Sequence, residues 1–295
     1  MNLKQLISFL LSICLIVFLQ SCGSSSSDKE KNSEEFKAAE ESLPKQIEEV
    51  VYNIPPPAEI PYLIQATGAD FNQSLLNPRS KADQYLTRND KAALNLGVYA
   101  TDIGYLSSYD KTQEAIDYLT TCKSLAENLN VIGSFDVDML KRFEKNIANK
   151  DSLALLINAS IDKADYYLKS DNRSKLAAQV IAGSFIEGLY ISTGLVKSYP
   201  KDLPDDARNL VLTPVISTVL KQKESVSEVR KMLGTVEKTD LITSLDTELG
   251  QLEKAYAGLN IEEQIKNNRA DLVLTDKNLT EITNIVDRMR NLISE

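Results

Sequence analysis

The sequence predicts an all-α protein: a multi-helix bundle of antiparallel helices with a C-terminal three-helix, coiled-coil-like section. Apolar residues recur at helical spacing along most of the chain, and no alternating strand pattern persists long enough to compete. Only 11 glycines and 9 prolines occur in 295 residues, which disfavours turn-rich β folds. The chain is 43% hydrophobic and 25% charged, so a sizeable core is available to such a bundle.

Five helices are expected in the first two thirds of the chain, at residues 89–109, 111–129, 136–149, 151–169 and 176–196. The first two follow each other with almost no loop, so they should pack antiparallel. The last is apolar on nearly all sides, which fits a transmembrane helix or a helix at the centre of a bundle. Its charge and its hydroxyl and amide side chains favour the central helix, because they are costly inside a bilayer.

Two of these apolar helices contain several glycines, among them Gly97, Gly104, Gly188 and Gly194. A glycine inside a helix destabilises it by about 1 kcal/mol relative to alanine. We therefore expect these residues where two helices approach each other closely.

The C-terminal third has a narrower apolar stripe with a seven-residue repeat. Three helices are expected, because apolar residues step by three and four positions through residues 212–233, 242–259 and 279–293. Narrow apolar stripes of this kind are typical of helices that pack side by side, so we expect a long antiparallel three-helix arrangement. Pro214 would lie near the start of the first of them, where it can kink the backbone.

The N-terminus has the pattern of an export signal. Lys4 supplies a positive charge before an apolar run at residues 6–19, and polar residues begin at Gln20. A transmembrane anchor needs about 20 apolar residues, so the shorter run favours a signal peptide.

A cysteine follows this run within Leu19-Gln20-Ser21-Cys22, which resembles the lipobox of bacterial lipoproteins. The resemblance implies that the Cys22 thiolate takes a diacylglyceryl group and becomes the first residue after cleavage. Stable anchoring takes two or more acyl chains, because each buried methylene contributes only about 0.8 kcal/mol. Gln20 departs from the small residue that the family prefers. Gly23 stands where an aspartate commonly signals inner-membrane retention, which implies transfer to the outer membrane.

These features divide the chain into consecutive parts. We expect a signal peptide at 1–21, a flexible tether rich in serine and charge at 22–42, a helical core region at 43–200 and a C-terminal section at 201–295. The last two are expected to form one continuous domain, 43–295.

Cys122 is the one cysteine that remains once the signal peptide is removed and Cys22 is acylated. The mature chain therefore cannot close a disulfide within itself. A core position is expected for Cys122, because it shares a helical face with small and apolar residues: Ala115, Leu119, Ala126 and Leu129.

The residue totals exclude several classes of function. The chain carries 33 basic and 42 acidic residues, a net charge of -9, which opposes binding to nucleic acid. It contains no histidine, so it has no Ser-His-Asp triad, no Cys-His pair and no histidine-ligated zinc. No nucleotide-binding, metal-binding or hydrolase motif is present in the sequence. We therefore expect a non-enzymatic protein without a cofactor or metal.

Two acidic residues inside apolar helices are the chemically notable feature. Asp102 lies in VYATDIGYL and Glu187 in SFIEGLY, with Tyr99 and Tyr190 nearby in sequence. A buried carboxylate must be paired, hydrogen-bonded or protonated. These residues predict either a structural bond between helices or a small pocket for a cation or polar ligand. Two carboxylates that face each other would also suit an acid-residue hydrolase.

Three stretches of the chain resemble an uncharacterised group of helical envelope lipoproteins from Bacteroidota-type Gram-negative bacteria. They are YNIPPPAEIPYLIQATGADFNQSLLNP (52–78), LNLGVYATDIGYL (94–106) and IAGSFIEGLYIST (181–193). The resemblance covers most of the mature chain and implies an envelope location and an all-helical fold, with no activity attached. Together these inferences predict a lipid-anchored interaction or scaffold protein that binds another envelope protein.

Overall fold

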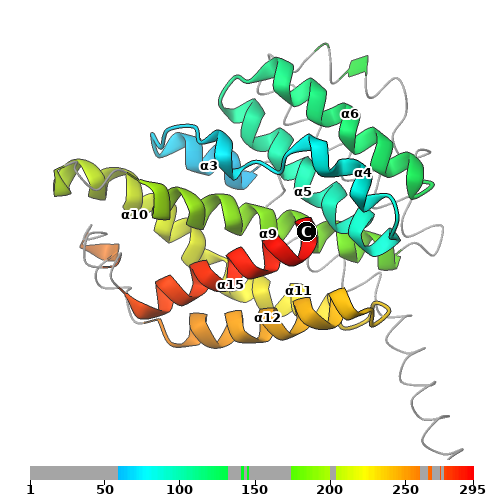
Figure 1. The fold of residues 1–295 in the computed structure, drawn as a ribbon. Coiled ribbons are helices and arrows are strands. Elements are labelled where there is room, and N and C mark those ends of the chain that lie inside the picture. The colour runs from blue at the N-terminus through cyan, green and yellow to red at the C-terminus, as the bar shows by residue number, and fades with distance from the viewer. Residues whose placement is uncertain are drawn as a thin grey trace, which may run out of the picture. The chain divides into compact units, whose positions relative to one another are not determined.

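The computed structural model describes residues 59–131, 141–142, 145, 174–199, 204–259, 265–267, 273 and 276–295. All of them belong to one compact unit, Leu43–Glu295. The described backbone is helical and contains no strand, so the predicted all-α bundle is confirmed (Figure 1). The signal peptide, Cys22 and the tether lie outside the described residues, as do nearly all of the helices expected at 136–149 and 151–169.

The chain enters the described fold through α3, Glu59–Ala66, and then crosses the α5–α6 pair as an irregular segment. This segment contains the short 3-10 turns η1 (Gln73–Leu75) and η2 (Arg79–Lys81) and the single-turn helix α4 (Ala82–Tyr85). Tyrosine hydroxyls fix its backbone at four points: Tyr109 and Tyr118 donate to the carbonyls of Ala69 and Asn77, Tyr99 donates to that of Pro78, and Tyr105 accepts from the Asn72 N–H.

Helices α5 (Asn89–Ser108) and α6 (Thr112–Asn128) form the predicted antiparallel pair, with bounds close to those expected. The tight connection turns at Asp110, which adopts a positive φ of 60°. Cys122 and the four residues that share its face are buried against α5, so the predicted core position is confirmed.

Helix α9, Ser174–Ser198, is the centre of the described fold. It packs on α5 and also contacts α3, α10, α11 and α15. By length and composition α9 could cross a membrane, but 78% of its apolar window is buried inside the protein. Its apolar side chains are therefore covered by other helices, as expected for a central core helix.

The crossing of α5 and α9 depends on two glycines. A Cβ atom placed on Gly97 would lie 2.0 Å from the Val180 carbonyl oxygen, and one on Gly183 would lie 2.0 Å from that of Leu94. The side-chain hydroxyl of Ser184 donates to the Gly97 carbonyl at 3.0 Å. The predicted close approach is confirmed at Gly97.

The C-terminal third differs from the expected three helices in two respects. The predicted first helix is two helices, α10 (Asp205–Lys221) and α11 (Lys223–Leu233), which meet at Gln222. Pro214 lies in the middle of α10 and not near its start. Single continuous helices were predicted correctly for α12 (Asp240–Ala257) and α15 (Lys277–Ser294).

The C-terminal helices do not form a separate core. Apolar residues of α11, α12 and α15 pack together with those of α9 in one hydrophobic cluster. In Figure 1, α15 (red) lies between α9 and α12 (orange), and it contacts both. The C-terminus of α15 consequently reaches α5 and the irregular segment before it.

Candidate functional site

The two predicted acids meet in the interior of the bundle, where a cation that the sequence analysis missed joins them. Asp102 comes from α5, Glu187 from α9 and Arg290 from α15. Both carboxyl groups are fully buried, and Arg290 is 5% exposed. The guanidinium of Arg290 donates through Nε to Glu187 Oε2 and through its terminal nitrogen to Glu187 Oε1 at 3.2 Å. Glu187 and Arg290 are therefore a two-point buried ion pair.

Asp102 has an unusual environment beside this pair. Its Oδ2 accepts the Asn77 backbone N–H at 3.1 Å, whereas its Oδ1 has no hydrogen-bond donor. The side chain nevertheless lies within hydrogen-bonding reach of the Glu187 carboxylate. Burial raises the pKa of Asp102 well above its ordinary value, and the neighbouring Glu187 charge raises it further.

The surroundings oppose ionisation of Asp102 more strongly than that of Glu187. Two carboxyl groups that lie close together away from water resist being ionised together, so the Glu187 charge adds to the effect of burial on the pKa of Asp102. Burial also raises the pKa of Glu187, but Arg290 opposes that rise. Arg290 therefore stabilises the negative charge on Glu187 directly, through two hydrogen bonds.

A neutral hydrogen-bond network extends from this cluster to the end of α15. Asn77 is fully buried, and its amide donates to Asn95 Oδ1 at 3.1 Å and to the Tyr85 hydroxyl at 3.3 Å. Asn95 donates in turn to the Ile293 carbonyl at 2.9 Å, and Tyr85 donates to the Ser294 carbonyl at 3.0 Å. The network satisfies backbone carbonyls that the last turn of a helix leaves without partners.

The two predicted tyrosines lie on different sides of the cluster. Tyr190 is part-buried and its ring lies against the Arg290 guanidinium, 5.2 Å from the ring centroid. Tyr99 instead donates to the Pro78 carbonyl at 3.0 Å, and its ring contacts those of Tyr85 and Tyr118. Among the described contacts, Tyr190 therefore belongs with Arg290, whereas Tyr99 belongs with the segment before α5.

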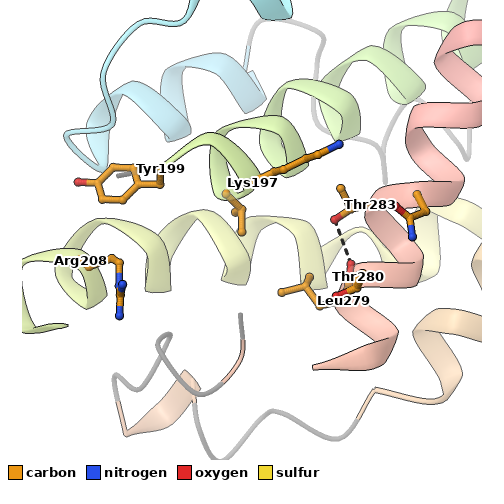
Figure 2. A pocket seen from close by; sticks show the side chains of 8 residues that line it. Lys197, Tyr199, Arg208, Leu279, Thr280 and Thr283 are labelled. Carbon is orange, nitrogen blue, oxygen red and sulfur yellow. Dashed lines mark hydrogen bonds between the residues drawn. The ribbon is translucent and has the colours of Figure 1, made fainter. Parts of the chain in front are cut away.

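A hollow of about 220 Å³ lies elsewhere, where the end of α9 meets α10 and the start of α15. Figure 2 shows Lys197 and Tyr199 at the end of α9, Arg208 on α10, and Leu279, Thr280 and Thr283 on α15. Its volume is below the roughly 300–1,000 Å³ of typical small-molecule pockets.

Several polar groups of this hollow already have partners inside the protein. Lys197 pairs with Asp287 at 2.9 Å, and the threonine hydroxyls donate to the carbonyls of Asp276 and Leu279. The hollow therefore offers few unoccupied groups to a ligand.

Sequence reasoning missed Arg290 and Asn77, which complete the cluster. Arg290 could have been found, because it follows Val286 by four positions and precedes Ile293 by three on the apolar face of α15. A buried cation on an apolar stripe needs an acid opposite, and Glu187 was already a candidate. Asn77 has no comparable signal, because an Asn-Pro pair ordinarily indicates only a turn.

Comparison with protein-family models, with curated proteins and with solved structures finds no match in any of the three. Among the residues that the structure describes, no group of three or more histidine, cysteine, aspartate or glutamate side chains could hold a metal ion. The chemistry of the site is that of a buried ion pair with an adjoining buried carboxyl group, and it brings three helices together.

Proposed function

We propose that this chain is a lipid-anchored cell-envelope protein that acts by binding another envelope protein and not by catalysing a reaction. The observation that supports the proposal best is that Asp102 and Glu187 are fully buried and bonded within the fold. A catalytic acid must reach a substrate or a reacting water. Neither side chain exposes any surface through which that contact could form.

The same burial disfavours the ligand or cation pocket at Tyr99, Asp102, Glu187 and Tyr190. Arg290 already supplies the positive charge that a bound cation would contribute. An acid-residue hydrolase is disfavoured for the same reason, since one of its two carboxylates is held in an ion pair. The cluster fits the structural interpretation, in which polar groups fix how helices pack.

The membrane anchor in this proposal is Cys22, and its support is the lipobox in the sequence. Acylation at Cys22 would hold the helical domain next to a bilayer, at the outer membrane if the implied transfer takes place. Confinement to a surface raises the effective concentration of partners in the same membrane, so a weak interface suffices.

Crosslinking in intact cells of the native host, followed by affinity purification of the acylated protein, tests this function. We expect one specific envelope protein to be recovered. The matched control is Cys22→Ala, which should be released from membranes and should recover much less of that partner. Recovery of abundant bystanders alone, or equal recovery with both proteins, would contradict the proposal.

A further inference from the structure

The second half of α10, residues 214–221, is anchored in the core of the bundle. Val215, Ile216 and Val219 are fully buried in this half. The hydroxyl of Tyr256 on α12 also donates to the Val219 carbonyl at 2.8 Å. Apolar contacts and a hydrogen bond to another helix therefore fix the second half in place.

The first half of α10, residues 205–213, is held less firmly. Leu212 is buried, but Leu210 is 69% exposed, the largest exposure of any large apolar side chain that the structure describes. The hydroxyl of Thr213 is buried without a hydrogen-bond partner, which opposes the packing of this half against the bundle. The residue before the helix, Pro204, supplies no side-chain cap to the first turn. Three separate features thus weaken the attachment of residues 205–213.

Pro214 marks the boundary between the two halves. A proline has no backbone N–H, so Pro214 cannot bond to the Leu210 carbonyl four positions before it, and its ring crowds that carbonyl. On the other side of the boundary, the Thr218 hydroxyl donates to the Pro214 carbonyl at 3.0 Å. The hydrogen bonding of α10 is therefore interrupted on the side of the first half, where a hinge can form.

The first half of α10 also forms one wall of the hollow between α9, α10 and α15, whose volume is about 220 Å³. Arg208 lines the hollow from this wall, whereas Val196 of α9 and Leu279 of α15 line it from the other sides (Figure 2). Leu212 packs with Val196 and Leu279 in one small hydrophobic cluster. Residues 205–213 therefore cover apolar side chains of two other helices.

We propose that residues 205–213 are a lid, hinged at Pro214, which opens over this hollow while the rest of the bundle stays folded. A helix this short is not stable in water without tertiary contacts, so the lid unwinds when it detaches. Opening removes one wall of the hollow and uncovers Val196 and Leu279. The lid is independent of the lipid anchor, because it depends only on contacts among the described helices.

Hydrogen–deuterium exchange of the full chain measures the opening. Amides of residues 209–213 are compared with those of 215–221, because the first turn of any helix has amides without partners. We expect residues 209–213 to be less protected by about tenfold or more, as local opening requires less free energy than global unfolding. Peptides from α9 and α15 should keep the protection of the folded core in the same sample.

Two substitutions should strengthen the closed lid. Thr213→Val keeps the shape of the side chain and removes the hydroxyl that lacks a partner, so protection of residues 209–213 should rise by about tenfold. Pro214→Ala should act in the same direction, because alanine supplies the missing N–H. Thr218→Val is the matched control, since the Thr218 hydroxyl already has a partner on the anchored side. This control should give no gain in protection of residues 209–213.

Equal protection of the two halves in the wild type would overturn the lid, and this comparison does not depend on whether any variant folds. Exchange of residues 209–213 only together with α9 and α15 would also overturn it, because the whole bundle would then be opening. An unchanged protection in Thr213→Val and Pro214→Ala, or an equal gain in Thr218→Val, would contradict the hinge at Pro214.

Discussion

At the scale of single residues, the buried cluster depends on Arg290. Burial opposes its charge, but the Glu187 carboxylate more than compensates and raises the pKa of Arg290. Removal of one partner from a buried pair leaves an uncompensated charge, which costs more than the intact pair contributes. Loss of one member is therefore expected to lower the free energy of unfolding by more than the intact cluster contributes to it.

We expect Arg290→Met to lower the free energy of unfolding by about 3–5 kcal/mol, the usual penalty for a broken buried pair. The control is Arg288→Met on the same helix. Arg288 is 44% exposed and binds Glu248 at the surface, so its loss should cost about 1 kcal/mol or less. Urea denaturation at neutral pH measures both changes. Equal effects of the two substitutions would argue against a special role for Arg290.

Individual residues show how much of the candidate site could be predicted from the sequence. Asp102 and Glu187 were found from the sequence, because an acid inside an apolar stripe violates the helical pattern locally. Asn77 was not found, since its role arises only when a segment before α5 folds over Asp102 and Asn95. Contacts of this kind join distant positions and leave no periodic trace in the sequence.

At the scale of helices, the decisive contact is the crossing of α5 over α9. Gly97 and Gly183 allow each helix to touch the backbone of the other, and hydroxyls of Thr101 and Ser184 bond across the contact. Two of the other glycines noted in the sequence, Gly188 and Gly194, accommodate the side chains of Ile60 and Leu75 instead. The crossing positions both acids of the buried cluster.

Gly97→Ala should therefore destabilise the protein, although alanine favours a helix by about 1 kcal/mol. Its Cβ would overlap the Val180 carbonyl oxygen, so the helices must separate, at a cost of about 1–3 kcal/mol or more. Gly250→Ala in α12 is the matched control, because its nearest atoms belong to the flexible end of Arg230. That variant should be neutral or more stable. Thermal unfolding compares the two, and a tolerated Gly97→Ala would contradict the close crossing.

Helix positions were predicted more accurately than helix partners. The bounds of α5, α6 and α12 lie close to the predicted ones, because local periodicity determines them. The break at Gln222 was missed, since Val219 and Val226 keep a seven-residue spacing across it. One continuous domain was expected, but α9 was not identified as the partner of the C-terminal helices, because an apolar stripe shows which face of a helix is buried and not which helix covers it.

At the scale of the whole molecule, the described helices form a bundle around α9, and the polar groups in its interior connect those helices to each other. The acids that the sequence offered as a structural bond, a ligand pocket or a hydrolase site are bonded inside the fold to Arg290 and to the Asn77 backbone. In the proposed function, the protein therefore acts through its position at a membrane and through its surface, and not through its buried acids. That assignment depends on the lipid anchor at Cys22.

Mass spectrometry of the protein isolated from its native membranes tests this central claim most directly. The account predicts a mature chain that begins at Cys22 and carries a diacylglyceryl group with a further acyl chain on its amine. A free Cys22 thiol, or a chain that still retains residues 1–21, would contradict it.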